Sequence, residues 1–232
     1  MWRSMLKVAA ATAVFGLVHK ALASRTAKRA ATRQFGERNR NGLYRVFYLA
    51  QSAVTFGMLA AYIRRQPSRE LFRSKGPLAF LMHAVQASAI VYATSAAEQV
   101  GIRRILGLEN LKHWLGEGPV LPEPEAQGPA LDDEEKMHAI GPFAWSRHPL
   151  NFAPLPILWL WPTMTTSLFA FNTAATIYLV IGSLHEEARF KEAFGEDYAA
   201  YLNSGVNFYV PATNRSTIES MNVVMDLELI PQ

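Results

Sequence analysis

Two short charged motifs flank a long apolar segment in the C-terminal half of this chain. The first motif is Arg147-His148-Pro149, and the second is Glu186-Glu187. An arginine suits a carboxylate or a phosphate, because its planar guanidinium can donate two parallel hydrogen bonds. A glutamate can receive an ammonium group. These residue types predict a site for a small charged molecule.

The apolar segment between the motifs, residues 150–184, is too long for one membrane helix, which needs about 20 residues. Pro162 and the polar run 163–167 interrupt it near its middle. Pro154 and Pro156 predict an irregular first arm, because proline lacks the amide hydrogen of a regular helix. We expect a hairpin of two short spans. A hairpin returns to the side where it began, so the two charged motifs should become neighbours.

Aromatic residues stand directly before the first motif. Phe143 or Trp145 could stack on a purine base, Arg147 could hold a carboxylate near a helix N-terminus, and Glu186 could hold an ammonium. Aromatic and acidic groups also suit a sulfonium cation. S-adenosylmethionine combines all these groups, so we expect it as the cofactor. The apolar side of the hairpin would present a lipophilic substrate.

Three further apolar stretches precede this region, at residues 8–23, 43–63 and 77–97. Each approaches the length of a membrane span. The chain is 50% hydrophobic and only 18% charged, against about 25% charged in soluble domains. We therefore expect an all-α fold, a polytopic membrane helix bundle with about five transmembrane helices. Arg3 and Lys7 make the first stretch resemble a signal peptide, but we interpret it as a retained span.

The remaining segments have distinct compositions. Residues 116–135 are rich in proline, glycine and acids and predict a mobile linker or lid. Residues 184–202 predict an amphipathic helix at the membrane surface, with its aromatic residues on one face. This face consists of Phe190, Phe194, Tyr198, Tyr201 and Leu202. The expected division is a three-span region (1–99), a cytoplasmic loop or linker (100–140), a cofactor-binding hairpin with the interfacial helix (141–211) and a tail (212–232).

Loop charge bears on orientation and on partners. The first loop is the most basic, and the hairpin turn carries no charge, so we place the first loop, the third loop and the C-terminus in the cytoplasm. The basic second loop argues the other way. We expect a multi-pass protein of the bacterial inner membrane, with the site on the cytoplasmic side. The net charge of +4 fits arginines beside membrane spans, and we expect no nucleic acid partner.

Cysteine is absent from the sequence. This excludes disulfide bonds, thiolate metal sites and a cysteine nucleophile. We expect no resident metal ion outside the haem alternative described below. The expected partners are the lipid bilayer and a hydrophobic or thiol small-molecule substrate.

The order of the motifs in residues 141–211 resembles the isoprenylcysteine carboxyl methyltransferase and phospholipid methyltransferase superfamily. That pattern is Gly-x-Tyr, Arg-His-Pro-x-Tyr, a membrane hairpin, Glu-Glu, Phe-Gly-x-x-Tyr-x-x-Tyr and a closing proline. The corresponding positions here are Gly141, Phe143, Arg147, His148, Pro149, Asn151, Glu186, Glu187, Phe194, Gly195, Tyr198, Tyr201 and Pro211. Residues 18–24 and 43–48 resemble the NnrU, nurim and methanethiol methyltransferase group within this broad relationship.

The resemblance implies a role for each matching position on the cofactor side. Arg147 and His148 would line the amino-acid end of S-adenosylmethionine, followed in the motif by Pro149. Glu186 would bind the cofactor at the end of the hairpin, and Phe143 would replace the tyrosine that contacts it.

The sequence departs from the superfamily on the substrate side. Asn151 replaces the tyrosine after Arg-His-Pro, and Gly182 replaces an arginine that serves prenylcysteine substrates. A thiol, a lipid or a small hydrophobic molecule is therefore a better acceptor than a prenylcysteine. If the acceptor is a thiol, His185 or Glu187 could accept its proton as a catalytic base.

Alternative interpretations of the same residues stay open at this stage. Arg147 and His148 could form a basic cap at the membrane boundary, and Glu187 could merely pair with Lys191 along a helix. His19, inside the first span, could hydrogen-bond to another helix. His19 and His148 could instead ligate haem b, as in the carotene isomerase related to NnrU. A nurim-like membrane scaffold without catalysis is a further alternative.

Overall fold

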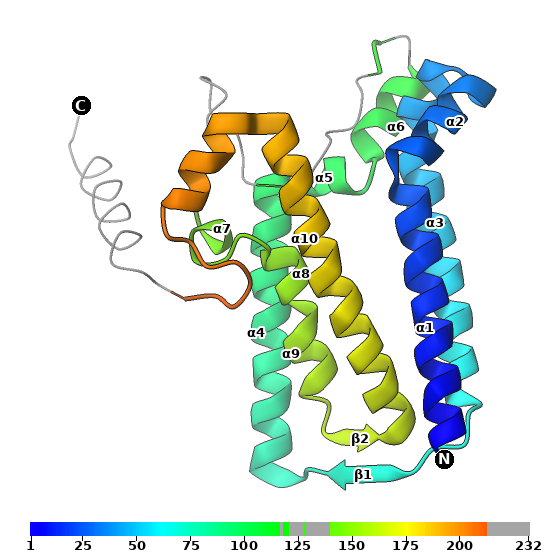
Figure 1. Ribbon diagram of the computed structural model, residues 1–232, viewed down its shortest axis with the longest axis vertical. Coiled ribbons are helices and arrows are strands. Elements are labelled where there is room, and N and C mark those ends of the chain that lie inside the picture. The colour runs from blue at the N-terminus through cyan, green and yellow to red at the C-terminus, as the bar shows by residue number, and fades with distance from the viewer. Residues whose placement is uncertain (117, 121–127, 129–139, 213–232) are drawn as a thin grey trace.

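The structure, a computed structural model, describes residues 1–116, 118–120, 128 and 140–212 and consists mostly of helices (Figure 1). The elements in chain order are α1 (Trp2–Ala23), α2 (Arg25–Phe35), α3 (Glu37–Arg64), β1 (Glu70–Arg73), α4 (Gly76–Val100), α5 (Ile102–Ile105), α6 (Leu108–Leu115), α7 (Pro142–Trp145), α8 (Pro149–Phe152), α9 (Pro154–Trp159), β2 (Thr163–Thr165) and α10 (Thr166–Asn203).

Within the described residues, four helices are long and apolar enough to cross a membrane, namely α1, α3, α4 and α10. Large hydrophobic side chains cover their outward faces. Examples are Leu17, Phe47, Val54, Met58, Phe80, Leu81, Val91 and Ile177. Soluble proteins avoid extended apolar surfaces of this kind, whereas lipid chains accept them. The predicted all-α polytopic membrane bundle is thereby confirmed.

The fifth predicted span has a different form. The hairpin is present, but its first arm consists of the short helices α8 and α9 in place of one continuous spanning helix (Figure 1). Prolines stand at the first position of each helix, Pro149 and Pro154, and Pro156 follows in α9. Pro154 and Pro156 lack the amide hydrogens that a continuous helix from Pro149 would need at these positions, and so the arm cannot form one long helix.

Neighbouring helices satisfy backbone carbonyls that the broken arm leaves free. The Gln86 amide of α4 donates to the Ile157 carbonyl at 2.9 Å, and the Asn172 amide of α10 donates to the Leu158 carbonyl at 2.7 Å. Both side chains are buried. An unsatisfied carbonyl at membrane depth costs several kcal/mol, so these amides make the irregular arm tolerable.

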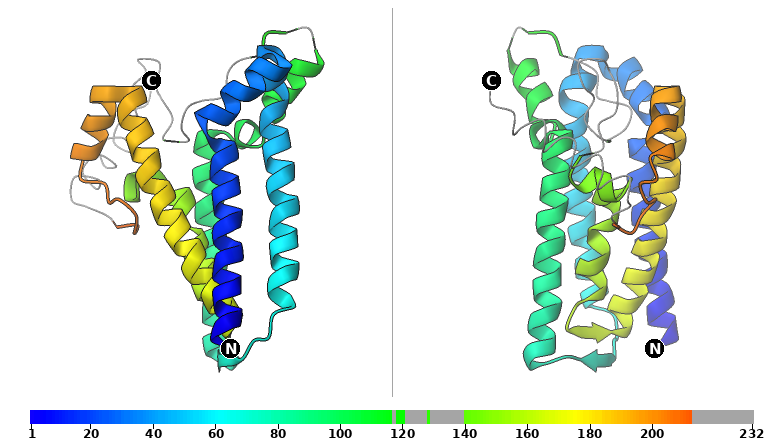
Figure 2. Two further views of the ribbon diagram at one scale, coloured as in Figure 1. Left: turned by 45° about the vertical axis from the view of Figure 1, so that its right-hand side comes forward. Right: turned by 90° about the vertical axis from the view of Figure 1, so that its left-hand side faces the viewer.

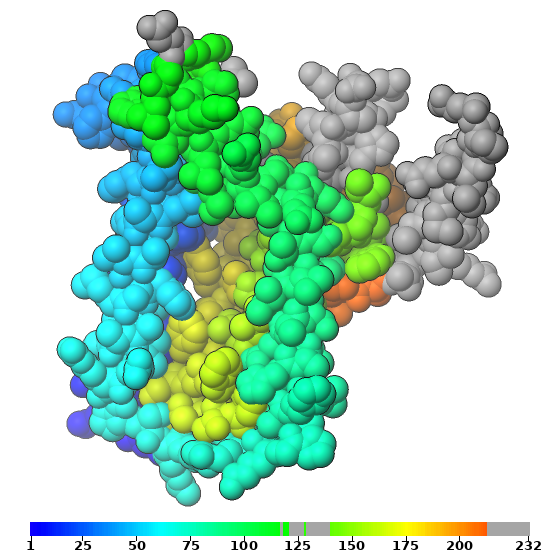
Figure 3. Space-filling view, turned by 180° about the vertical axis from the view of Figure 1, so that it is seen from behind, coloured from blue at the N-terminus to red at the C-terminus, as the bar shows by residue number. Residues whose placement is uncertain are grey.

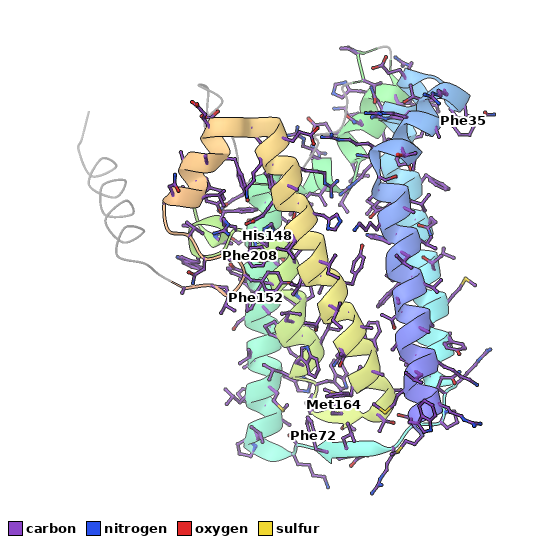
Figure 4. The ribbon with its side chains drawn as sticks, in the orientation of Figure 1. Phe35, Phe72, His148, Phe152, Met164 and Phe208 are labelled. Atoms are coloured by element: carbon purple, nitrogen blue, oxygen red, sulfur yellow. The ribbon has the colours of Figure 1, made fainter. Side chains whose placement is uncertain are left out.

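The turn of the hairpin is bound to the second loop. β1 and β2 pair antiparallel, with Phe72 opposite Met164 (Figure 4). The Ser68 hydroxyl also accepts a hydrogen bond from the Ser167 amide at 3.1 Å, next to the start of α10. The sequence correctly predicted an interruption at 163–167. The pairing partner could not be foreseen from the loop composition.

The helix α10 bends near its C-terminal end. Gly195 adopts φ 49° and ψ −115°, a left-handed conformation that favours glycine. The bend brings Phe190 and Tyr198 into a stack with ring centroids 5.1 Å apart. Phe190, Tyr198 and Tyr201 are buried together with Val206. The expected interfacial helix is therefore the end of α10, and protein covers its aromatic face, contrary to the expected exposure to lipid.

The described loops divide between the two ends of the bundle. α2, α5, α6 and the bent end of α10 lie at one end, whereas β1, β2 and the N-terminus lie at the other (Figures 1 and 2). This places the first loop and the beginning of the third loop on the same side, as expected. Most of the predicted linker 116–135 and the tail from 213 onward lie outside the described residues.

The amide of Asn172 gives a test of the broken arm. We expect Asn172→Leu to reduce the free energy of unfolding by about 1–3 kcal/mol, because the Leu158 carbonyl loses its donor at membrane depth. Denaturant titration in mixed micelles measures this loss. The matched control is Thr173→Val, which removes an exposed hydroxyl bonded only within α10, and it should change stability by less than about 0.5 kcal/mol. Equal losses in the two variants would contradict the assignment.

Candidate functional site

The hairpin brings the two charged motifs together, as its geometry predicted. The Arg147 Nε lies 2.7 Å from Glu187 Oε1, and both side chains are mostly buried. The backbone carbonyl of Val206 accepts a further hydrogen bond from Arg147 Nη1 at 2.6 Å. The guanidinium is thus fixed on two sides at the end of the bundle where α10 bends.

His148 lies beneath this ion pair and is buried (Figure 4). Its Nδ1 donates to Glu186 Oε2 at 3.3 Å, because a carboxylate can only accept. Its Nε2 lies 3.5 Å from Glu187 Oε1 and makes no hydrogen bond with any described residue. The ring packs edge-on against Phe208 with centroids 5.1 Å apart.

Asn151 completes the contacts of Glu186. Its amide nitrogen donates to Ser183 Oγ at 3.0 Å and to Glu186 Oε2 at 3.2 Å. The residue that departs from the superfamily pattern is therefore part of the cluster. Pro149, the next motif position, is buried and begins α8 directly beside these residues.

The two carboxylates of this cluster differ in their partners among the described residues. Arg147 forms an ion pair with Glu187, whereas Glu186 accepts hydrogen bonds from Asn151 and His148 and contacts no lysine or arginine. A carboxylate that is four-fifths buried without a lysine or arginine partner favours a positively charged ligand. Glu186 is thus the group most suited to hold one.

Sequence reasoning missed the segment 206–209, which closes one side of the site. The Asn207 carbonyl accepts from the Arg147 amide at 2.8 Å, and the guanidinium carbon lies 5.6 Å from the centroid of the Phe208 ring. The Tyr209 hydroxyl donates to the Asn151 carbonyl at 2.8 Å. Burial raises the pKa of Tyr209 to about 12, so the phenol keeps its proton at neutral pH. The aromatic pair after the bent helix was the signal that could have indicated this role.

Ser146 was also missed, although it joins the motif to the closing segment. Its hydroxyl donates to the Tyr209 carbonyl at 2.7 Å and accepts from the His148 amide at 3.2 Å. The residue is fully buried. It holds the backbone turn that aims His148 inward.

The two expected purine-stacking residues are packed against protein. Phe143 is 1% exposed, and its carbonyl accepts from the Tyr201 hydroxyl at 2.7 Å, so its ring has no free face for a ligand. Trp145 stacks on Tyr92 of α4 with centroids 6.1 Å apart and planes nearly parallel. Its indole nitrogen is buried without a partner among the described residues.

Trp145 and Tyr92 line an apolar groove of about 550 Å³ between α4 and the helices α7 to α9. The other lining residues are Val85, Ser88, Ala89, Val91, Ser95, Gly141, Pro142, Phe152, Ala153, Pro156 and Pro211. Its volume lies in the range of small-molecule sites. Phe152 projects from α8, next to the charged cluster (Figure 4). The groove can accommodate a hydrophobic molecule close to the cluster.

His185 is not brought into the cluster. Its Nε2 accepts from the Lys20 ammonium at 2.8 Å, and its Nδ1 donates to the Ile181 carbonyl at 2.9 Å. It therefore faces α1 on the other side of α10. Of the two expected proton acceptors, the structure places Glu187 alone among the charged motifs.

The ring nitrogens of His19 are both engaged with α3. The Ser52 hydroxyl donates to the Tyr48 carbonyl at 2.7 Å and therefore accepts from His19 Nδ1 at 2.9 Å. The Tyr48 hydroxyl then donates to His19 Nε2. A haem iron bound to His19 would have to displace one of these bonds, so the geometry favours the interhelical role.

Comparisons with known proteins add one partial relationship. The methanethiol S-methyltransferase of Pseudomonas deceptionensis is 36% identical over 70 residues, which cover 30% of this chain and 26% of that protein. The match thus spans about a quarter of that relative's length. No family model and no solved structure matches the chain. The similarity supports a relationship to methyltransferases in general.

The ion pair between Arg147 and Glu187 allows a test by a double-mutant cycle. Arg147→Ala should cost about 3 kcal/mol of unfolding free energy, because it leaves a buried carboxylate without its cation. The coupling between Arg147→Ala and Glu187→Ala should exceed about 1 kcal/mol in micellar unfolding experiments. The control cycle uses the exposed pair between Arg25 of α2 and Glu192 of α10, whose coupling should lie near 0–1 kcal/mol. Equal couplings would refute a special role for the buried pair.

Proposed function

We propose that this chain is an integral membrane methyltransferase that uses S-adenosylmethionine and methylates a small hydrophobic, thiol or lipid acceptor. The partial similarity to a methyltransferase supports the reaction class, and the four apolar helices support the membrane location. The single observation that carries the proposal is the buried carboxylate of Glu186, which has no lysine or arginine partner among the described residues. The ordered motifs also support membership of the broader superfamily.

The residues present fit the cofactor at its charged end. Glu186, oriented by Asn151, would hold a cationic group such as the ammonium or the sulfonium. His148, whose Nε2 makes no hydrogen bond with a described residue, and the guanidinium of Arg147 would line the amino-acid end of the cofactor. The bound cofactor supplies a methyl group activated by a positively charged sulfur. Alignment of the acceptor with that methyl group is the main task left to the protein.

The apolar groove supports a hydrophobic acceptor. It lies on the side of α8 that carries Phe152, next to the charged cluster, and opens between apolar helices. A thiol acceptor must lose its proton before or during transfer, and we assign this proton to Glu187, since His185 is bound to Lys20 on the other face of α10. We further propose that the site faces the cytoplasm from a bacterial inner membrane, as loop charge favours.

Cofactor binding is tested with S-adenosylhomocysteine by isothermal titration of the purified protein. We expect Glu186→Gln to weaken binding at least about tenfold, equivalent to about 1.4 kcal/mol, because the glutamine keeps the shape and loses the charge. Glu192→Gln removes the same charge from an exposed position on α10 and should bind like the native protein.

Two outcomes would overturn the proposal. One is a folded native protein that binds no S-adenosylhomocysteine at millimolar concentration. The other is equal binding by Glu186→Gln and Glu192→Gln. An absorption spectrum after expression with ample haem tests the haem b alternative, which predicts a Soret band that disappears in His148→Ala.

A further inference from the structure

The face of α10 turned toward α1 and α3 carries a second polar cluster, separate from the proposed cofactor site. Three cations belong to it: Lys20 of α1 bonds His185 at 2.8 Å, Arg45 of α3 lies 5.7 Å from the centroid of the Tyr48 ring, and Arg189 follows His185 by one turn of α10. We propose that this cluster binds the phosphate headgroup of an anionic phospholipid whose acyl chains occupy the hollow between α3 and α4.

The hollow follows from the way the helices pack. α1 contacts both α3 and α10 and forms the wall that they share. Seen from behind, the surface is open between α3 and α4, with α10 at the back of the opening and the segment containing α5 above it (Figure 3). Because the surrounding helices are apolar on their outward faces, the opening faces lipid chains.

The aromatic wall of the cluster is fixed by close packing. A Cβ atom on Gly16 would lie 2.7 Å from a ring carbon of Tyr178, so α1 approaches this ring as only a glycine permits. The His19 ring meets Tyr178 edge-on with centroids 6.2 Å apart. His19 is itself bound to Ser52 and Tyr48. The phenol of Tyr178 is therefore positioned before any ligand arrives.

The three cations lack carboxylate partners in the described part of the chain. The guanidinium of Arg45 lies 5.7 Å from the centroid of the Tyr48 ring and donates through Nε to the Ile105 carbonyl. Lys20 uses one of its three protons to bond His185, and Arg189 forms no hydrogen bond or ion pair with a described residue. Arg189 stands one turn after His185 on α10, and therefore on the same side of the helix as the bond to Lys20. Three uncompensated charges favour a multivalent anion.

An anionic phospholipid offers both a charged group for the three cations and apolar chains for the hollow. Its phosphate suits guanidinium and ammonium groups, and its chains suit the apolar hollow between α3 and α4. Basic residues at the end of a span can also extend toward headgroups while their stems pack on apolar surface. This site uses the side of α10 that carries Tyr178 and His185, about a quarter turn around the helix from Glu186. It uses none of the residues assigned to the cofactor, so the proposal does not depend on the proposed methyl transfer.

The experiment titrates the full chain in neutral detergent with phosphatidylglycerol and follows thermal unfolding. We expect phosphatidylglycerol to raise the melting temperature, whereas phosphatidylcholine and inorganic phosphate should not. Arg189→Gln should weaken the apparent affinity for phosphatidylglycerol at least about tenfold, the loss of one strong charged contact. The control Lys191→Gln removes an exposed charge two residues away and should leave the affinity unchanged.

Tyr178→Phe provides a second variant that keeps the packing and removes only a hydroxyl, and it should weaken lipid binding several-fold. The proposal is overturned if phosphatidylcholine stabilises the protein as well as phosphatidylglycerol does, or if Arg189→Gln and Lys191→Gln respond alike. Stabilisation by inorganic phosphate alone would overturn the lipid as occupant. S-adenosylhomocysteine binding should be retained in Arg189→Gln, which separates failure of this site from failure of the cofactor site.

Discussion

The arrangement of this protein depends on one constraint, the need of every backbone carbonyl at membrane depth for a hydrogen-bond donor. The rule is broken where α9 ends, and the amides of Gln86 and Asn172 supply donors to its last carbonyls from two flanking helices. These bonds attach the broken arm to both α4 and α10. Because α8 begins at Pro149, the arm that these bonds anchor continues directly from Arg147 and His148, which meet Glu186 and Glu187 of α10. The charged cluster therefore lies at the start of the irregular arm.

The helix α10 packs against α1 on one side and against α8 on another, and the two sides carry different residues. One face carries Ser183, Glu186 and Glu187 toward α8. The other carries Tyr178 and His185 toward α1. The bend at Gly195 then turns the end of the helix back, so that Phe190 and Tyr198 seal the region above the cluster. One element therefore separates a proposed cofactor site from a proposed lipid site.

The sequence predicted the membrane helices and the meeting of the two charged motifs, because hydropathy and hairpin direction suffice for both. It could not predict that Phe143 would be buried or that His185 would face Lys20, since helical rotation depends on tertiary packing. The role of Tyr209 was equally hidden, because its contact with Asn151 joins residues far apart in the chain. The i, i+4 spacing of the aromatic residues at 190–202 places them on one face of a helix. It could not show that a bend at Gly195 would pack this face against protein.

The closing segment has a consequence for biosynthesis. Arg147 reaches its carbonyl partners only when Val206 and Asn207 are present, and Asn151 meets Tyr209 later still along the chain. Translation proceeds from the N-terminus, so both arms of the hairpin must leave the ribosome before the site can be completed. The order of synthesis therefore places insertion into the bilayer ahead of ligand binding. A nascent chain that stalls within α10 is a membrane protein without a finished site.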